Sequence, residues 1–90
     1  MVELNSIADL KSLGPKSQAM LEHAGINSVE QIQELGAVAA YVLTKRVNGN
    51  VSLNLLWALE SALTGMPWQQ VAREHRLSLL LALEKAEKHL

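Results

Sequence analysis

The sequence contains no cysteine and no phenylalanine, and aromatic residues make up only 3% of its 90 residues. Without cysteine the chain can form no disulfide scaffold, no thiolate zinc site and no thiol nucleophile. Neither sign of charge dominates, since 8 Lys and Arg residues stand against 9 Asp and Glu residues, for a formal net charge of −1. This balance argues against a basic arm that coats nucleic acid.

Long hydrophobic runs are also missing. The longest apolar run covers the seven residues 37–43, far short of the roughly 18 that a membrane-spanning helix needs. The first residues show no basic segment followed by an apolar stretch, so no secretory signal is visible. We therefore expect a cytoplasmic protein with no membrane contact.

Apolar residues are nonetheless abundant, at 49% of the chain. This share is enough for one hydrophobic core, and we expect residues 1–90 to form a single domain. A chain of this length buries roughly 60 to 65% of its unfolded surface and should have a radius of gyration of about 12 Å. Little volume remains for a deep catalytic cavity, so we expect no cofactor and no small-molecule substrate.

Glycine and proline interrupt the chain at intervals that suit short helices, which predicts an all-α, compact bundle of five or six of them. Between the last two helices, residues 69–72 should make at most one turn. The predicted helices cover residues 6–13, 15–25, 28–36, 37–46, 53–63 and 76–88.

Local signals set several of these boundaries. Ser28 can cap a helix while Gln31 reaches back as its reciprocal partner. The pair Asn48 and Gly49 is a stop signal that is also typical of a β-hairpin turn. The alternation of apolar and polar residues that a hairpin needs ends at residues 55–59, which read LLWAL, so we reject the hairpin. Ser52 is then the expected cap of the next helix.

Residues 53–63 are apolar almost all round, with Asn54 and Ser61 as the clearest polar positions. Such a helix should run through the middle of the domain. We expect Trp57 on this helix and Trp68 after Pro67 to pack in the core, with Trp68 folded back onto the central helix. A role for the two rings in recognition is the alternative.

Several motifs together resemble one known family. They comprise LGPKS at residues 13–17, AGI at 24–26, LGA at 35–37 with Tyr41, SLNLLWALE at 52–60, LTG at 63–65, and Trp68. In combination they look like the C-terminal domain of the TfoX/Sxy competence regulators, over about residues 7–85. The segment LNLLWALE is the most specific part of the resemblance.

The resemblance implies a helix-hairpin-helix-like, SAM-like fold and a regulatory role without enzymatic activity. Proteins of this family are bacterial regulators of natural transformation that act on the transcription of competence genes. In the two-domain regulators this domain follows a separate N-terminal domain, for which 90 residues leave no room. The sequence is therefore expected to be either a fragment or a free-standing version.

The turn before the second predicted helix resembles the hairpins that hold nucleic-acid phosphates. A helix start aims backbone N–H groups and a positive dipole at an anion. Two residues depart from the full pattern, since Ser12 replaces a common first glycine and Pro15 lacks an N–H. A tight helix connection with no ligand is therefore the alternative, and one such contact gives weak binding, around 10⁻⁴ M. The predicted DNA contacts are Ser12, Gly14, Lys16 and Ser17, with Lys11 as an auxiliary charge.

The final predicted helix carries more leucine than one core-facing stripe needs. We expect its surplus leucines to form a protein interface, unless residues 68–72 cover the extra side. The partner would be a second copy, a TfoX N-terminal-type domain or a transcription factor. The predicted interface residues are Leu77, Leu79, Leu80 and Leu83, next to Leu81.

The histidines and serines give no catalytic or metal-binding pattern. His23, His75 and His89 do not pair with one another or with carboxylates at a diagnostic spacing. The serines Ser17, Ser28 and Ser52 have capping or turn positions, and no nucleophile elbow is present. We therefore expect no metal and no enzymatic activity.

Overall fold

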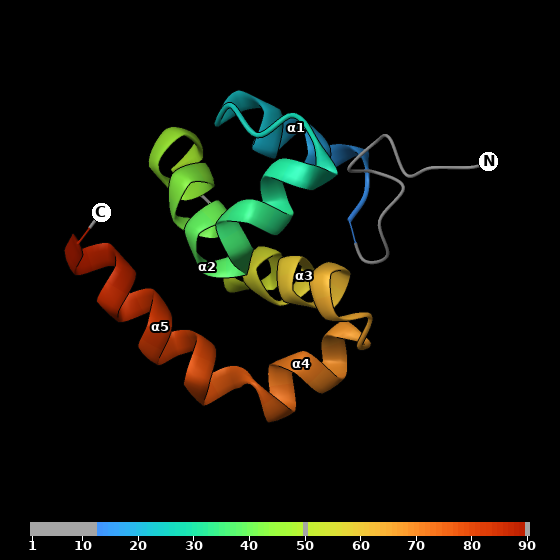
Figure 1. The fold of residues 1–90 in the computed structure, drawn as a ribbon, viewed down its shortest axis with the longest axis vertical. Helices are drawn as coiled ribbons and strands as arrows, with labels where there is room; N and C mark the ends of the chain where they lie inside the picture. The colour runs from blue at the N-terminus through green and yellow to red at the C-terminus, as the bar shows by residue number, and fades with distance from the viewer. Residues whose placement is uncertain (1–12, 50, 90) are drawn as a thin grey trace.

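The computed structural model describes residues 13–49 and 51–89, and within them the chain forms five α-helices and no strand. Figure 1 shows α1 (Pro15–His23) at one end of the molecule and α4 (Trp68–Glu74) and α5 (Arg76–His89) at the other. Between them lie α2 (Val29–Asn48) and α3 (Leu53–Thr64). The radius of gyration, 12.2 Å, matches the value expected for a single domain of this length.

The start of α1 follows the sequence signals. Gly14 is the N-cap and Pro15 occupies the first helical position, where its missing N–H removes no helical hydrogen bond. After the helix, the N–H of Ile26 donates to the carbonyl of Leu21 at 2.9 Å, which folds the chain back and buries both side chains. The helix predicted at residues 6–13 lies outside the described residues, apart from the buried Leu13.

Helix α2 begins at the predicted capping box. The backbone N–H of Gln31 donates to Ser28 Oγ at 3.2 Å, and the N–H of Ser28 donates to Gln31 Oε1 at 3.1 Å. Gly36 interrupts the helix with φ 82° and ψ 165°, a conformation that glycine adopts most readily. The two helices predicted on either side of Gly36 are thus two segments of α2 joined at a kink. The second segment ends at the predicted stop, with Asn48 as its last residue and Gly49 as its C-cap.

Helix α3 is the centre of the core, as the sequence predicts. Leu56 and Leu59 are fully buried and Trp57 is 7% exposed. Ser52 stands at the predicted N-cap, but its side chain makes no capping hydrogen bond. Ser61, one of the two polar positions noted on this helix, is fully buried, because the turn after Gly65 closes over it and its hydroxyl donates to the carbonyl of Met66.

Helix α4 is longer than the single turn that the sequence predicts, since it extends over Trp68–Glu74. The expected burial of Trp68 is also wrong, because this side chain is 44% exposed. Val71, three residues later, is fully buried and takes the position that faces the core. Trp68 therefore lies at the edge of the contact between α3 and α4.

Helix α5 packs mainly against α2 and α4 and forms one flank of the molecule (Figure 1). Leu79 and Leu83, one turn apart, are buried against the core. Near the C-terminal end, Lys45 Nζ of α2 lies 3.1 Å from Glu87 Oε2. At the other end, the Nδ1 atom of His75, which caps α4, lies 3.4 Å from Glu60 Oε2 of α3.

We expect Trp57→Ala to lower the free energy of unfolding by about 3 to 5 kcal/mol, because it removes the largest side chain that α3 buries. Urea unfolding followed by circular dichroism measures the change. Trp68→Ala is the matched control, since the loss of a ring that is 44% exposed should cost far less. An unchanged unfolding midpoint for Trp57→Ala would show that α3 does not organise the core.

Candidate nucleic-acid and protein-binding surfaces

The start of α1 carries the residues predicted to contact DNA. Gly14 has φ −122° and ψ −171°, which is extended backbone and not the left-handed conformation of a tight glycine turn. Lys16 is exposed and Ser17 is half-buried, and both lie in the first turn of α1. The other two predicted contacts, Lys11 and Ser12, lie outside the described residues. Within the described part, the predicted site is therefore one lysine and one serine at a helix start.

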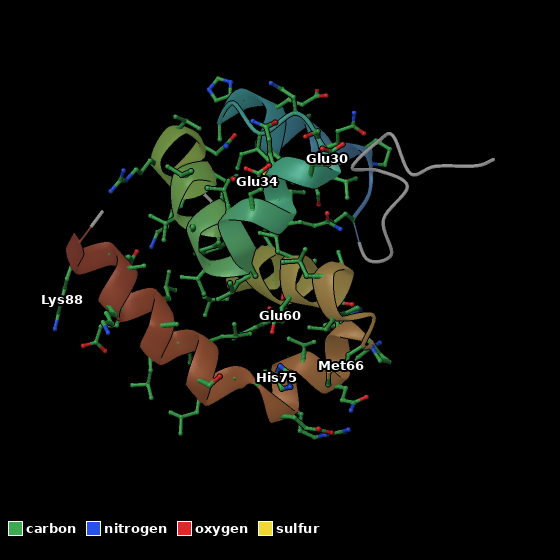
Figure 2. All side chains as sticks on the ribbon, viewed as in Figure 1. Glu30, Glu34, Glu60, Met66, His75 and Lys88 are labelled. Atoms are coloured by element: carbon green, nitrogen blue, oxygen red, sulfur yellow. The ribbon has the colours of Figure 1, made fainter. Side chains whose placement is uncertain are left out.

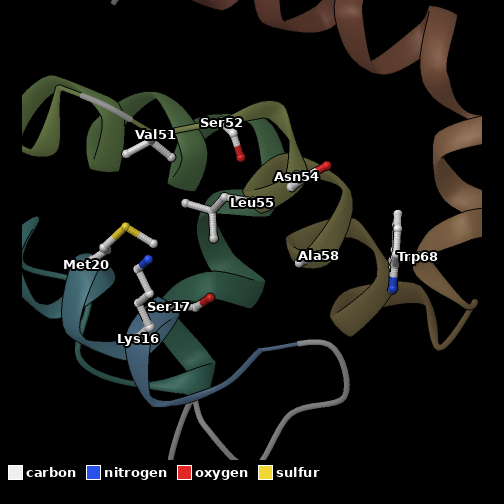
Figure 3. Close-up of a pocket in the computed structure, with 9 residues that line it drawn as sticks. All are labelled: Lys16, Ser17, Met20, Val51, Ser52, Asn54, Leu55, Ala58 and Trp68. Atoms are coloured by element: carbon white, nitrogen blue, oxygen red, sulfur yellow. The ribbon is translucent and has the colours of Figure 1, made fainter.

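Lys16 and Ser17 line a surface groove of about 390 Å³ between the starts of α1, α3 and α4 (Figure 3). In Figure 3 Lys16 and Trp68 stand on opposite sides of this groove, and Leu55 and Ala58 of α3 lie between them. Its remaining lining comes from Met20, Val51, Ser52 and Asn54. We call this feature the α1–α3–α4 groove.

Sequence reasoning found one side of the groove and missed the rest. The motif at residues 13–17 predicts Lys16 and Ser17 as site residues, whereas the sequence predicts only a capping role for Ser52 and a core position for Trp68. Helix α2 separates the α1 residues of the groove from those of α3 and α4, so their proximity depends on tertiary packing. The one local signal was Pro67, which starts a new helix after the Gly65 cap and places Trp68 at an exposed helix start.

The outer face of α5 is the second candidate surface. Leu77 and Leu81 are 71% and 59% exposed, whereas Leu79 and Leu83 are buried. Leu80 is half-buried and packs against the core. The predicted interface set is therefore revised, because Leu79 and Leu83 already serve the core of this chain. Leu77 and Leu81, four residues apart on the opposite side of the helix, carry the exposed apolar surface.

Charged residues surround this leucine pair. Lys88 Nζ pairs with Glu84 Oε1 at 3.4 Å one turn along the helix, and both side chains are more than 60% exposed. Figure 2 shows Lys88 projecting from the outer end of α5. Arg73 and Glu74, at the end of α4 just before this helix, are also exposed. The outer face of α5 is thus a short apolar stripe with a polar border, which is typical of a protein contact.

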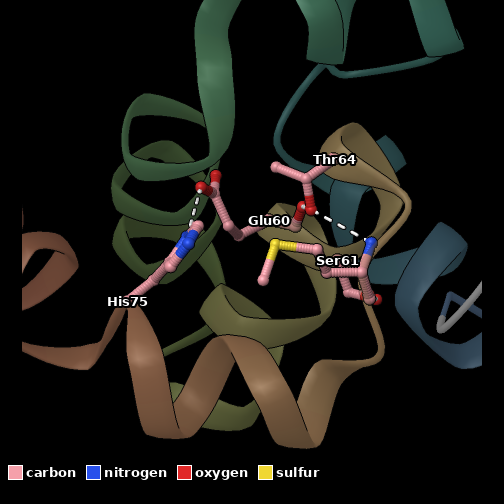
Figure 4. A network of polar contacts seen from close by, with 5 residues as sticks. Glu60, Ser61, Thr64 and His75 are labelled. Atoms are coloured by element: carbon pink, nitrogen blue, oxygen red, sulfur yellow. Dashed lines mark hydrogen bonds and ion pairs between the residues drawn. The ribbon is translucent and has the colours of Figure 1, made fainter.

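A polar network joins α3 to α4, around the Glu60–His75 contact (Figure 4). Thr64 Oγ1 donates to the carbonyl of Glu60 at 2.8 Å and accepts from the N–H of Met66 at 3.2 Å. These contacts fix the turn between α3 and α4. Among the described residues, no group of three or more His, Cys, Asp or Glu side chains could hold a metal ion.

A second polar cluster links α2 to α5 and to the loop before α3. The Tyr41 hydroxyl donates to the carbonyl of Val51 at 3.2 Å, and burial raises the pKa of this hydroxyl above its ordinary value. The hydrogen bond to Glu87 raises the pKa of the Lys45 ammonium. Both groups are therefore held in their protonated forms in the folded chain.

None of the described helices is both long and apolar enough to cross a membrane. In comparison with known families, the model described as the TfoX C-terminal domain matches residues 3–83. The matched region includes the α1–α3–α4 groove and most of α5. No curated protein and no solved structure matches the sequence.

The raised pKa values of Tyr41 and Lys45 predict a loss of stability at alkaline pH. A raised folded-state pKa contributes stability that is present below the ordinary values of 10.0 and 10.5 and is lost as pH rises through the folded values. We expect Tyr41→Phe to remove the share of this stability loss at alkaline pH that comes from titration of the Tyr41 hydroxyl. At neutral pH the same change should cost about 1 kcal/mol, because the Val51 carbonyl loses its donor.

Urea unfolding at neutral pH and at about pH 11 separates these two effects. Tyr41→Phe should lie below the unchanged chain at neutral pH, and the gap should narrow as pH rises. A gap that stays constant across the range would show that Tyr41 does not titrate differently in the folded and unfolded chains.

Proposed function

Because the chain belongs to the TfoX C-terminal domain family, a family of regulatory domains and not of enzymes, we propose that it regulates by binding a protein partner through the outer face of α5. The motifs read from the sequence predicted this family. The regulated process is the transcription of competence genes, as the family resemblance implies, and its place is the bacterial cytoplasm.

The exposure of Leu77 and Leu81 is the observation that supports this function. A leucine that stays in water forgoes roughly 1.5 to 3 kcal/mol of burial free energy, and here two of them lie one turn apart. The same helix buries Leu79 and Leu83, so the chain could have closed its core with polar residues on the outer face. A partner that covers Leu77 and Leu81 would recover the burial free energy.

Three occupants of this face are compatible with the proposal. They are a TfoX N-terminal-type domain on another chain, a transcription factor, and a second copy of this chain. The outer face of α5 alone is small compared with the roughly 800 Å² that each partner contributes to a standard interface. A stable complex therefore needs contacts beyond the leucine pair, or else the contact is transient.

We also propose, as a second candidate, that the start of α1 contacts DNA phosphates. The exposed Lys16 favours this role, since it makes no ion pair with the described residues. Pro15 and the net charge of −1 limit its strength. We expect such binding to be non-specific, weak and strongly dependent on salt.

The partner-binding proposal predicts that Leu77→Ser combined with Leu81→Ser abolishes regulation without unfolding the chain. The test measures transcript abundance in cells that lack the gene and carry either the original sequence or the variant. Val47→Ser combined with Leu53→Ser is the matched control, because these two apolar side chains are also exposed, at 48% and 37%, but lie outside α5.

We expect the original sequence and the control to restore the transcripts that deletion changes, and the α5 variant to fail. Full restoration by the α5 variant would exclude this face as the partner surface. A deletion that changes no transcript would remove the regulatory role itself. Sedimentation equilibrium of the purified chain identifies a second copy as the occupant if the monomer mass doubles and the α5 variant stays monomeric.

The DNA candidate predicts salt-sensitive binding that Lys16→Glu abolishes. In an NMR titration with a short duplex at low salt, amide shifts should be confined to the residues around the start of α1. Each neutralised phosphate should lower the logarithm of the affinity by about 0.9 per tenfold rise in salt. If millimolar DNA causes no shift, the start of α1 serves only as a helix connection.

A further inference from the structure

The α1–α3–α4 groove has a lining that neither the partner surface on α5 nor a phosphate contact explains. None of its lining residues comes from α5, so it is separate from the outer face described above. Its volume of about 390 Å³ lies within the range of roughly 300 to 1,000 Å³ that is usual for ligand-binding pockets.

Apolar side chains form the floor and one side of the groove. Met20 of α1, Val51 before α3, and Leu55 and Ala58 on α3 supply the floor. Trp68 stands at the side, 44% exposed. Tryptophan is among the residues most enriched at binding hot spots, since a large rigid ring loses little conformational entropy when it is covered.

The polar part of the lining is positive or neutral. Among the described residues that line the groove, Lys16 is the charged one, Ser17, Ser52 and Asn54 add hydroxyl and amide groups, and none is aspartate or glutamate. Lys16 makes no ion pair with the described residues. The Ser52 hydroxyl makes no capping hydrogen bond with α3. An occupant that complements this lining carries a negative charge beside Lys16 and polar backbone groups opposite the serines.

We propose that the α1–α3–α4 groove is a docking site for a short acidic segment of a partner protein. The segment places a leucine-like or aromatic side chain against Leu55 and Trp68, and an aspartate or glutamate carboxylate beside Lys16. The positive ends of the α1 and α3 dipoles at this groove favour the same sign of charge.

The lining favours a peptide over nucleic acid. Affinity for nucleic acid depends on several phosphate contacts by lysine or arginine, and the described lining of this groove offers Lys16 alone. Most of its described lining is apolar, which suits side chains of a protein better than a sugar-phosphate backbone. The chain as a whole is slightly acidic, which further disfavours a polyanion.

A random library of short displayed peptides, selected on the purified chain, tests the proposal. The enriched peptides should combine aspartate or glutamate with leucine, methionine or aromatic residues. Lys16→Glu and Trp68→Ala should each weaken a selected peptide by about tenfold or more, since both residues contact the occupant. Lys85→Glu is the matched control for Lys16→Glu, because it makes the same charge change on exposed α5 and should leave affinity unchanged.

Circular dichroism confirms that each variant is folded before its affinity is measured. The proposal is overturned if no peptide is enriched, if the enriched peptides are basic, or if Lys16→Glu and Trp68→Ala bind as tightly as the unchanged chain. It is also overturned if single-stranded DNA competes for the groove more effectively than the selected peptides. The α5 variants of the previous section should bind the peptide normally, so failure of one proposal leaves the other intact.

Discussion

Leu55, Leu56 and Leu59 lie almost wholly out of water on a helix of twelve residues, and such a helix needs neighbours on nearly every side. Helices α2 and α4 are its main neighbours, and each must change direction to reach it. The kink at Gly36 redirects α2, and the left-handed cap at Gly65 turns the chain from α3 into α4. The burial of α3 thereby sets the positions of both candidate surfaces.

Both candidate surfaces lie where the described helices leave large apolar side chains exposed to water. Within residues 13–49 and 51–89, the helices enclose α3, but none of them covers Leu77 and Leu81 on the outer face of α5. The groove forms where α1, α3 and α4 begin close together and Trp68 does not close the space between them. The two candidate surfaces are separate, so a partner on one would leave the other accessible.

Local chemistry made much of the fold predictable. The capping pair Ser28 and Gln31, the break at Gly36 and the stop at Gly49 depend on near neighbours in the chain, and the structure has all three. Positions that depend on distant packing were harder. Ser61 looked polar, yet the following turn covers it. Trp68 looked like a core residue, yet Val71 takes the buried place on α4.

The same division applies to the candidate sites. The excess of leucine on the last helix predicted an exposed apolar face, but separating Leu77 from Leu79 requires knowledge of which side α2 covers. For the groove, the motif at the start of α1 pointed to Lys16 and Ser17 alone. Its other walls come from α3 and α4, and no sequence spacing brings these two helices beside α1.

The attachment of α5 has a consequence for cooperativity. Its main neighbours are α2 and α4, and its polar ties to the body are the exposed Lys45–Glu87 pair and the contacts around the α4–α5 junction. Sub-global opening could release α5 while the packing of α1, α2 and α3 persists. The released helix would present leucines on every side. A partner that binds this open form would couple its own affinity to the local unfolding equilibrium of α5.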